Sequence, residues 1–318
     1  IALSLVGSEM CIRDSSQSLA KDLAGELGWE HHSIEARRFP DSEGYIRIPE
    51  GAIDAVRKEP VVLVSNTFPD AGIVETLLLL EALRDVREGR LENLKGIGPQ
   101  ELETVGPGVI VAIPYFGYSR QDKRFRPGEA ISARAIGHLL ASRCDGIVVF
   151  DLHAPAALSD MEIPVAFTSA MPEIADHLEK EISPDFILSP DKGAIERASA
   201  VAKAINKPFS YLEKIRIDAH TIIHKAKDLD VEGKVVAIVD DMIATGGTIC
   251  KAADALRSQG AIEVHAACTH GLFTGGAIDR LSNHVDGVHA TSSLANSRAV
   301  ISGGAALARG VKELLNDL

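Results

Sequence analysis

The stretch VVAIVDDMIATGGT, at residues 235–248, decides the fold that the sequence predicts. An apolar run of strand length ends in two carboxylates, Asp240 and Asp241, and a Thr-Gly-Gly-Thr turn then opens directly into a helical pattern. Because glycine has no Cβ, consecutive backbone N–H groups in such a turn can surround an anion, and the new helix directs its positive dipole end at the same point. The stretch therefore predicts a phosphate site at the carboxyl end of a buried strand.

The chemistry of this stretch favours a phosphorylated polyol as the ligand. Carboxylates repel a phosphate, so the two acids are placed for hydroxyl groups or a metal ion, and ribose 5-phosphate fits both parts. An ordinary glycine-rich turn with solvated acids is the alternative, but it does not explain why acids, glycines and threonines occur together at one strand end. The expected ribose-phosphate cradle consists of Asp240, Asp241, Ala244, Thr245, Gly246, Gly247 and Thr248.

Outward from this stretch, apolar runs of strand length alternate with helical patterns along the chain. The run VVLVSNT, which starts at Val61, aligns with VVAIVDD, which starts at Val235, and a loop, a helix and another apolar run follow each of them. We interpret this alignment as a weak internal duplication. Strands that are apolar on both faces, with helices between them, form parallel sheets covered on both sides. The predicted fold is α/β, with two tandem similar domains whose parallel sheets are flanked by helices.

The predicted domain boundaries follow the two copies of this pattern. Residues 16–154 form an N-terminal α/β domain, residues 155–298 a C-terminal domain, and residues 299–318 a helix that packs back on the N-terminal domain. Residues 1–15, IALSLVGSEMCIRDS, resemble a translated sequencing adapter, so we expect the first sheet to lack its native first strand. The alternative is a native strand, IALSLV, followed by a loop.

The segment at residues 88–108 interrupts the first domain with five glycines and two prolines. Within it, LENLKGIGPQELETV has the spacing of a helix–hairpin–helix turn, which often binds DNA phosphates. A surface insertion is the favoured interpretation, because acids outnumber bases in the segment and the formal net charge of the chain is -12. That charge makes nucleic acid a poor partner but does not exclude a small anionic ligand held by local groups.

The composition is that of a two-domain globular protein. The chain has 318 residues, of which 46% are hydrophobic and 25% charged. Its four cysteines show no CxxC pair and no metal-ligand spacing, which indicates a reduced, cytoplasmic protein. No apolar run reaches the roughly 18 residues that span a bilayer, so we expect no membrane partner.

Two further segments carry cations suited to phosphate chemistry. In PYFGYSRQDKRF, at residues 114–125, Arg120 and Gln121 follow an aromatic run; a basic surface loop is the alternative, but it leaves the aromatic residues unexplained. Lys214 and Arg216 are two positions apart, so on an extended segment both point to the same side and can close over a transferring diphosphate. A lysine and an arginine on a solvated strand are the alternative.

A histidine and an aspartate each follow a predicted strand. His153 lies just past the apolar run at residues 146–150, and Asp191 lies just past the run at residues 186–188. Ligands collect at this edge of a parallel sheet, and a carboxylate is a natural ligand for Mg²⁺. A lone histidine, however, is more often structural.

Taken in order along the chain, these motifs resemble those of the ribose-phosphate pyrophosphokinases, most closely the archaeal-type branch. The glycine-rich loop at residues 235–248 resembles the phosphoribosyl-diphosphate motif of the type I phosphoribosyltransferase fold. The other matching segments are RFPDSE, PYFGYSRQDKRF, DLH, SPDKGA and YLEKIRIDAH, and the likeness covers nearly the whole chain from Gln17 onward.

The resemblance implies roles for individual residues. Lys214 and Arg216 would be catalytic, and His153 and Asp191 would help to hold Mg²⁺. The hairpin RFPDSE would clasp ATP, usually in a neighbouring subunit, so the family pattern implies a homo-oligomer with a shared ATP site. Ser42 stands where the family usually has glycine, which implies backbone strain if that position needs a positive φ. The expected ATP-binding residues are Phe39, Asp41, Ser42, Glu43, Arg120, Gln121 and Asp122.

The activity that the resemblance implies is that of a ribose-phosphate diphosphokinase. ATP and ribose 5-phosphate would give AMP and 5-phospho-α-D-ribose 1-diphosphate for nucleotide biosynthesis. Two alternatives remain at this point. A type I phosphoribosyltransferase would use the same loop but has no need of FGYSRQD or the hairpin. A non-catalytic, synthetase-associated regulatory subunit would be expected to lack Lys214 and Arg216, which this chain retains.

Overall fold

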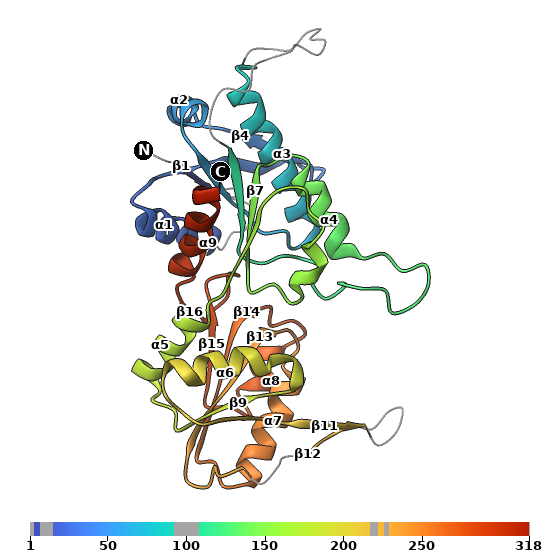
Figure 1. Ribbon diagram of the computed structural model, residues 1–318, viewed down its shortest axis with the longest axis vertical. Coiled ribbons are helices and arrows are strands. Elements are labelled where there is room, and N and C mark those ends of the chain that lie inside the picture. The colour runs from blue at the N-terminus through green and yellow to red at the C-terminus, as the bar shows by residue number, and fades with distance from the viewer. Residues whose placement is uncertain (1–2, 7–14, 92–107, 217–221, 226–228, 318) are drawn as a thin grey trace. The chain divides into compact units, whose positions relative to one another are not determined.

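The computed structural model describes residues 3–6, 15–91, 108–216, 222–225 and 229–317 (Figure 1). They form two compact units: the first comprises Ile1–Thr168 and Gly303–Leu318, and the second comprises Ser169–Ser302. The division falls after Thr168 and not after residue 154, because β8 (Val165–Thr168) pairs with β7 (Gly146–Phe150) in the sheet of the first unit.

The first unit is built on a six-stranded sheet in which every neighbouring pair is parallel. Its central strands are buried along their whole length, as the apolar runs predicted. In spatial order the strands are β2 (Glu30–Ser33), β1 (Leu3–Val6), β5 (Val61–Val64), β6 (Val109–Ile113), β7 and β8. The sheet thus has a strand at Leu3–Val6, where a gap was expected. A strand here is the alternative that the sequence left open for the N-terminal residues.

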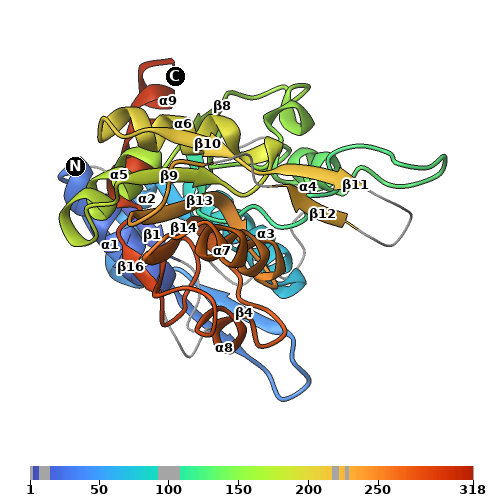
Figure 2. The same cartoon turned by 90° about the horizontal axis from the view of Figure 1, so that it is seen from below.

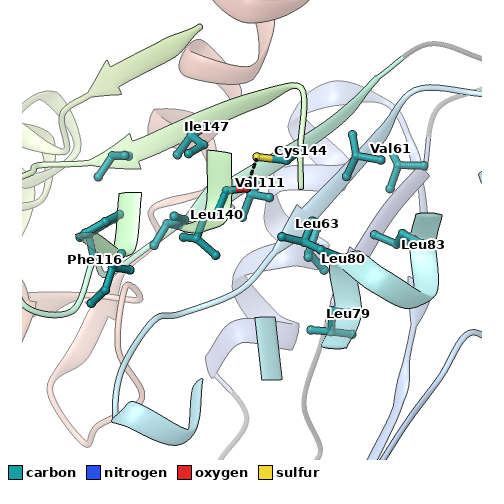
Figure 3. Packing of buried hydrophobic residues seen from close by; sticks show 14 of the residues in the cluster. Val61, Leu63, Leu79, Leu80, Leu83, Val111, Phe116, Leu140, Cys144 and Ile147 are labelled. Atoms are coloured by element: carbon teal, nitrogen blue, oxygen red, sulfur yellow. Dashed lines mark hydrogen bonds between the residues drawn. The ribbon is translucent and has the colours of Figure 1, made fainter. Parts of the chain in front are cut away.

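Helices cover both faces of this sheet. On one face, α1 (Ser15–Leu27) packs against α9 (Gly304–Asp317), which also contacts β7 and β8 of the first unit. On the other face, a hydrophobic cluster joins the sheet to α2 (Glu50–Lys58), α3 (Asp70–Arg87) and α4 (Ser132–Ala141). In this cluster, leucines of α3 pack beside β5, and the Cys144 thiol donates a hydrogen bond of 3.3 Å to the carbonyl of Leu140 (Figure 3).

The second unit repeats the same topology. All neighbouring strands of its sheet are parallel, and the order is β10 (Phe209–Tyr211), β9 (Phe186–Ser189), β13 (Val235–Ile243), β14 (Glu263–Gly271), β15 (Gly287–Thr291) and β16 (Ala299–Ile301). In both sheets the second strand lies at the edge and the first strand lies beside the third. The expected fold of two similar domains is confirmed, and β5 and β13 hold equivalent positions.

The duplication also extends to a hairpin. In the first unit, the antiparallel pair β3 (Glu35–Arg38) and β4 (Gly44–Arg47) comes between the edge strand and β5. In the second unit, β11 (Glu213–Arg216) and β12 (Ile222–Lys225) come between the edge strand and β13 and extend from it as an arm (Figure 2). Each sheet therefore carries one projecting hairpin at the same point of its chain order.

The remaining elements of the second unit are short connections and flanking helices. They are α5 (Met171–Glu181), the 3-10 turn Lys192–Ala194, α6 (Ile195–Ala204), α7 (Gly247–Ser258) and α8 (Ala277–Leu281); the first unit has one 3-10 turn, Pro155–Leu158. Most of the insertion at residues 88–108, including the stretch with helix–hairpin–helix spacing, lies outside the described residues. In the part of the chain that the structure describes, no helix has the length and apolar character to cross a membrane.

Three histidines of the second unit form a chain that ends on a carboxylate. His177 Nε2 lies 2.9 Å from His289 Nδ1, and His289 Nε2 lies 3.2 Å from His265 Nδ1. His265 Nε2 in turn lies 2.8 Å from a carboxylate oxygen of Glu263. Because an ionised carboxylate can only accept, all three hydrogen bonds form when each imidazole ring is neutral and carries its proton on Nε2. Burial and the neighbouring histidines lower the pKa of His289 to about 4, and burial also lowers that of His177.

The free energy of unfolding should fall as the pH drops from about 6.5 towards about 4, because the unfolded chain then binds protons that the folded unit excludes from His289 and His177. His289→Gln keeps a donor and an acceptor but cannot titrate, so urea midpoints of this variant should depend less on pH in that window. His284→Gln, outside the chain of histidines, is the control. An unaltered pH dependence in His289→Gln contradicts this account.

Candidate active site

The strand order reverses between β9 and β13, and the candidate site of the second unit lies at the carboxyl ends of these two strands. Such a reversal leaves a crevice at that edge of a parallel sheet, where ligands bind. Asp191 follows β9, and Asp240 and Asp241 lie in the last part of β13. The cradle expected for a phosphate, at residues 244–248, follows directly. Residues that were predicted separately from two segments thus share one edge of one sheet.

Gly246 fixes the shape of the turn. Its φ of 76° is in the left-handed region, and a Cβ built on it would lie 2.9 Å from Cγ of Leu281. Glycine is required at this position for both reasons. The carbonyl of Gly246 accepts a hydrogen bond of 2.9 Å from the N–H of Cys250, so α7 begins at once. The turn therefore ends at the N-terminus of a helix of three turns, where unsatisfied N–H groups and the helix dipole favour an anion.

The carbonyls of the turn are held on one side by residues 272–280. The N–H groups of Leu272 and Phe273 donate to the carbonyl of Ile243 over 3.0 and 3.1 Å. The N–H of Thr274 donates to the carbonyl of Ala244 over 2.9 Å. In a trans peptide the N–H points opposite to the carbonyl. The N–H of Thr245 is therefore directed away from this segment.

The two acids differ in their surroundings. Asp241 is buried and forms an ion pair with Arg197, whose Nη2 lies 3.3 Å from Oδ2, and its backbone N–H donates to Oδ1 of Asp240 over 2.8 Å. Burial, and next the adjacent Asp241 carboxylate, raise the pKa of Asp240 well above its ordinary value. The charge of Asp191 raises the pKa of Asp240 further. This carboxyl is thus suited to a hydroxyl donor or a cation that stabilises its ionised form.

Asp191 follows β9, and the two catalytic candidates lie in a strand of the projecting hairpin. The side chain of Asp191 accepts a hydrogen bond of 2.8 Å from the N–H of Gly193, and its carbonyl accepts one of 2.6 Å from the Ser189 hydroxyl. Lys214 and Arg216 lie in β11, in register with His224 and Ile222 of β12, so the expected extended conformation is confirmed. Residues 217–221, between these strands, lie outside the described part of the chain.

In the first unit, the loop that carries Arg120 is anchored by its aromatic run. Phe116 is buried in the core, and the N–H of Gly117 donates to Oγ1 of Thr67 over 2.7 Å. A Cβ on Gly117 would lie 2.1 Å from the carbonyl oxygen of Thr67, so only glycine fits. The Tyr118 hydroxyl donates to Asp70 over 2.8 Å. The buried part of the loop thus fixes its start, and Arg120 is left exposed.

Gln121 and Asp122 follow in the same loop. The Gln121 amide nitrogen donates to the carbonyls of Lys123 and Ala130 over 3.2 and 3.3 Å, so this side chain connects two parts of its own loop. Glu129 accepts from the N–H groups of Phe125 and Arg126 over 2.8 and 3.0 Å, which closes the far end of the loop. Asp122 is partly exposed beside them.

The hairpin β3–β4 presents an aromatic side chain at its turn. Phe39 is 41% exposed and packs edge-on to Tyr45 with ring centroids 6.0 Å apart. The turn is closed by hydrogen bonds from the N–H of Phe39 to the carbonyl of Glu43 and from the N–H of Glu43 to Asp41, 2.9 and 3.1 Å long. Ser42 has a φ of 75°, so the position where glycine was expected does require the left-handed conformation.

The two predicted metal ligands lie in different units. His153 is exposed just after β7 of the first unit, whereas Asp191 belongs to the second. Among the residues that the structure describes, no three histidine, cysteine, aspartate or glutamate side chains converge in a way that could hold a metal ion.

Sequence reasoning missed residues that contact the expected site segments, among them Arg197, Thr67 and Arg280. Arg197, on α6, pairs with Asp241, and Thr67, after β5, accepts the hydrogen bond of Gly117. For Thr67 a signal was present, because it follows an apolar strand at the point that aligns with Asp241. For Arg197 the pattern of a surface helix gave no such signal.

Two family models match parts of this chain. Residues 165–291 match the phosphoribosyl transferase domain, and residues 106–143 match the N-terminal domain of ribose phosphate pyrophosphokinase. The ribose-phosphate pyrophosphokinase of Thermoplasma acidophilum is 35% identical over 91% of this chain and 93% of its own. That of Methanothermobacter thermautotrophicus is 38% identical over 91% and 94%. The relatives are mainly archaeal, as expected.

A solved structure matches the whole chain. The crystal structure of phosphoribosylpyrophosphate synthetase from Mycobacterium smegmatis superposes with a TM-score of 0.77 and 25% identity, and the match covers 100% of this chain and 99% of that one. The predicted fold class is confirmed by this likeness as well as by the strand order.

Asp240→Asn should raise the urea unfolding midpoint of the ligand-free protein at neutral pH. The reason is that the folded state disfavours the ionised form of Asp240, so this charge lowers stability above its ordinary pKa. Asp241→Asn should instead lower the midpoint, since it removes the ion pair with Arg197. Urea unfolding of both variants measures this; equal shifts in the same direction would contradict the difference between the two acids.

Proposed function

The chain belongs to the ribose-phosphate pyrophosphokinase family, and from that premise we propose that its second unit binds ribose 5-phosphate and its first unit binds ATP. The protein is an enzyme, a transferase that forms 5-phospho-α-D-ribose 1-diphosphate. The observation that carries the assignment of the sugar to the second unit is the cradle after β13, with its acid pair.

Ribose 5-phosphate would place its phosphate against the N–H groups at residues 244–248. The geometry that supports this is the left-handed Gly246 and the start of α7 directly after it. Asp240 and Asp241 would accept hydrogen bonds from the ribose hydroxyls. The raised pKa of Asp240 means that its ionised form is disfavoured in the free protein. A hydroxyl donor from the sugar would stabilise that ionised form.

ATP would bind through the hairpin and the loop after β6. The exposed ring of Phe39 would stack near the adenine, with Asp41, Ser42 and Glu43 around the nucleoside. Arg120 would bind phosphate oxygens through its fork of N–H donors, with Gln121 and Asp122 beside it. The exposure of Phe39 and Arg120, next to anchored backbone, supports both assignments.

In the transfer step, the C1 hydroxyl oxygen of ribose 5-phosphate would form a bond to the β-phosphorus of ATP as the bond from that phosphorus to the α,β-bridging oxygen breaks. AMP leaves with that oxygen, and the hydroxyl proton is lost. Lys214 and Arg216 would neutralise the charge that gathers on the transferring group. Positioning and electrostatic stabilisation supply most of the rate in such transfers.

Asp191 and His153 would each serve as a ligand of magnesium in this proposal. Mg²⁺ is usually bound by one or two carboxylates together with substrate phosphates and water, so a carboxylate such as that of Asp191 is a suitable ligand. The ion would neutralise charge on the phosphates of ATP.

We also propose a cytoplasmic homo-oligomer with ATP sites shared between subunits. The exposed aromatic turn of the β3–β4 hairpin is a surface that a neighbouring copy can complete. Cys144, Cys250 and Cys268 are buried free thiols, and burial raises the pKa of each, which agrees with a reducing compartment.

The assay that tests the function is AMP release from ATP and Mg²⁺, with and without ribose 5-phosphate. AMP should form only when the sugar phosphate is present, because its C1 hydroxyl is the acceptor. A phosphoribosyltransferase would show no such release, and neither would a regulatory subunit. Folded protein that releases no AMP with the sugar phosphate contradicts the proposal.

Lys214→Ala should lower kcat by about a hundredfold or more, the scale for losing one donor to a transition state, while the Kd for ribose 5-phosphate changes little. Steady-state kinetics and calorimetry separate the two effects. Lys225→Ala, on the partner strand β12 of the same hairpin, is the matched control and should keep most of the turnover. A change confined to KM in Lys214→Ala refutes the transition-state role.

A further inference from the structure

The phosphate turn of the second unit is braced by a segment from another part of the chain, residues 272–281. Backbone N–H groups of this segment already bind the carbonyls of Ile243 and Ala244. The next carbonyl along the turn, that of Thr245, is bound by a side chain: Nη1 of Arg280 donates to it. Three successive carbonyls of the turn are thus fixed by one segment, and the last of them depends on a single arginine.

Arg280 binds two backbone positions at once. While Nη1 donates to the carbonyl of Thr245, Nη2 donates to the carbonyl of Gly275 over 3.0 Å. Gly275 and Gly276 both have positive φ values, 60° and 70°, so the chain turns sharply here before α8 starts. The planar guanidinium therefore bridges the phosphate turn and the turn that leads into α8, a geometry that a single ammonium group cannot reproduce.

The neighbouring residue of α8 supports the same turn by packing. Leu281 is fully buried, and its Cγ, Cδ1 and Cδ2 atoms lie within 2.9 to 3.2 Å of the position that a Cβ on Gly246 would occupy. Leu281 thus fills the space beneath Gly246, and Arg280 binds the carbonyl just before it. The two side chains hold the peptide between Thr245 and Gly246 from adjacent positions of one short helix.

The orientation of that peptide decides what a phosphate can bind. Because the N–H and carbonyl of a trans peptide point in opposite directions, a carbonyl of Thr245 that is held on Arg280 directs the N–H of Gly246 to the opposite side. The charge of Arg280 is also felt in the first turn of α7, where it opposes the rise that burial causes in the pKa of Cys250. Geometry and charge both act on the N-terminus of α7, where the phosphate would bind.

We propose that Arg280 is a positioning residue for sugar-phosphate binding: by bridging the carbonyls of Thr245 and Gly275, it orients the N–H of Gly246 towards the 5-phosphate. This inference rests on the proposed binding of ribose 5-phosphate at the turn. Arg280 does not touch the ligand in this account and acts through the backbone, so its loss changes how well the phosphate is bound and leaves the ATP side unaltered.

The test compares Arg280→Ala and Arg280→Lys with Arg257→Ala. Arg257 is a matched control, since it also lies in the second unit and its guanidinium also donates to a backbone carbonyl, that of Ile262, over 2.6 Å; it pairs with Asp286 as well. It is at the far end of α7 from the turn. Calorimetry with ribose 5-phosphate alone gives the Kd, steady-state kinetics give both KM values, and thermal melting reports the fold.

Arg280→Ala should raise the Kd and KM for ribose 5-phosphate about tenfold to a hundredfold, the range for losing one or two hydrogen bonds from a charged donor, with the KM for ATP within about twofold. Arg280→Lys should stay closer to Arg280→Ala than to the wild type, because it keeps the charge but not the bridge. Arg257→Ala should bind the sugar phosphate as the wild type does, whatever its melting temperature.

Three results would overturn the inference. One is a folded Arg280→Ala with wild-type affinity for ribose 5-phosphate. Another is full recovery in Arg280→Lys, which would leave charge alone as the cause. The third is an equal rise of both KM values. Failure of the proposed function is recognised separately, since the wild type would then release no AMP that depends on the sugar phosphate or would bind none of it in calorimetry.

Discussion

The candidate site of the second unit depends on the residues at the carboxyl end of β13. The strand is buried through Val239, as the middle of a sheet covered on both faces must be, and its next two residues are carboxylates. An ionised carboxyl in such a place is unfavourable unless a partner stabilises it. Asp241 has Arg197 as a partner, whereas burial and its neighbours raise the pKa of Asp240. Functional sites commonly hold groups in positions that stability alone would not select, and a ligand then supplies the missing interaction.

Around this strand end, the backbone is arranged to present donors on one side. Carbonyls from Ile243 to Thr245 are all bound by residues 272–280, and the carbonyl of Gly246 is bound within the first turn of α7. A turn with free carbonyls would offer an anion as much repulsion as attraction. Since the carbonyls are held elsewhere, the glycines can do what the sequence suggests, which is to let N–H groups approach a phosphate closely.

The parts of this arrangement that the sequence predicts are those encoded locally. The acids, the glycines and the start of α7 are adjacent in the chain, and the β3–β4 hairpin follows from its turn residues. The parts it does not predict come from distant segments. Arg197 and Arg280 contact the site only through the tertiary structure, and nothing in a helical pattern marks them. The edge strand β8 was missed because it is short and half exposed, with Phe167 41% accessible, so it lacks the continuous apolar run of a central strand.

The two units share one topology, so the residues at equivalent strand ends can be compared, and their differences explain why the units are expected to differ in function. The alignment of VVLVSNT with VVAIVDD places Asn66 opposite Asp240 and Thr67 opposite Asp241. In the first unit these positions are neutral and bind its own chain: Asn66 accepts from the N–H of Tyr115 over 2.6 Å, and Thr67 accepts from that of Gly117 over 2.7 Å. The same edge of the sheet is thus occupied by the loop that presents Arg120, so the first unit has a fixed loop where the second has an acid pair. The amide of Asn66 and the hydroxyl of Thr67 therefore organise a loop of their own unit. The two carboxylates of Asp240 and Asp241, at the equivalent strand end, are suited to an external sugar.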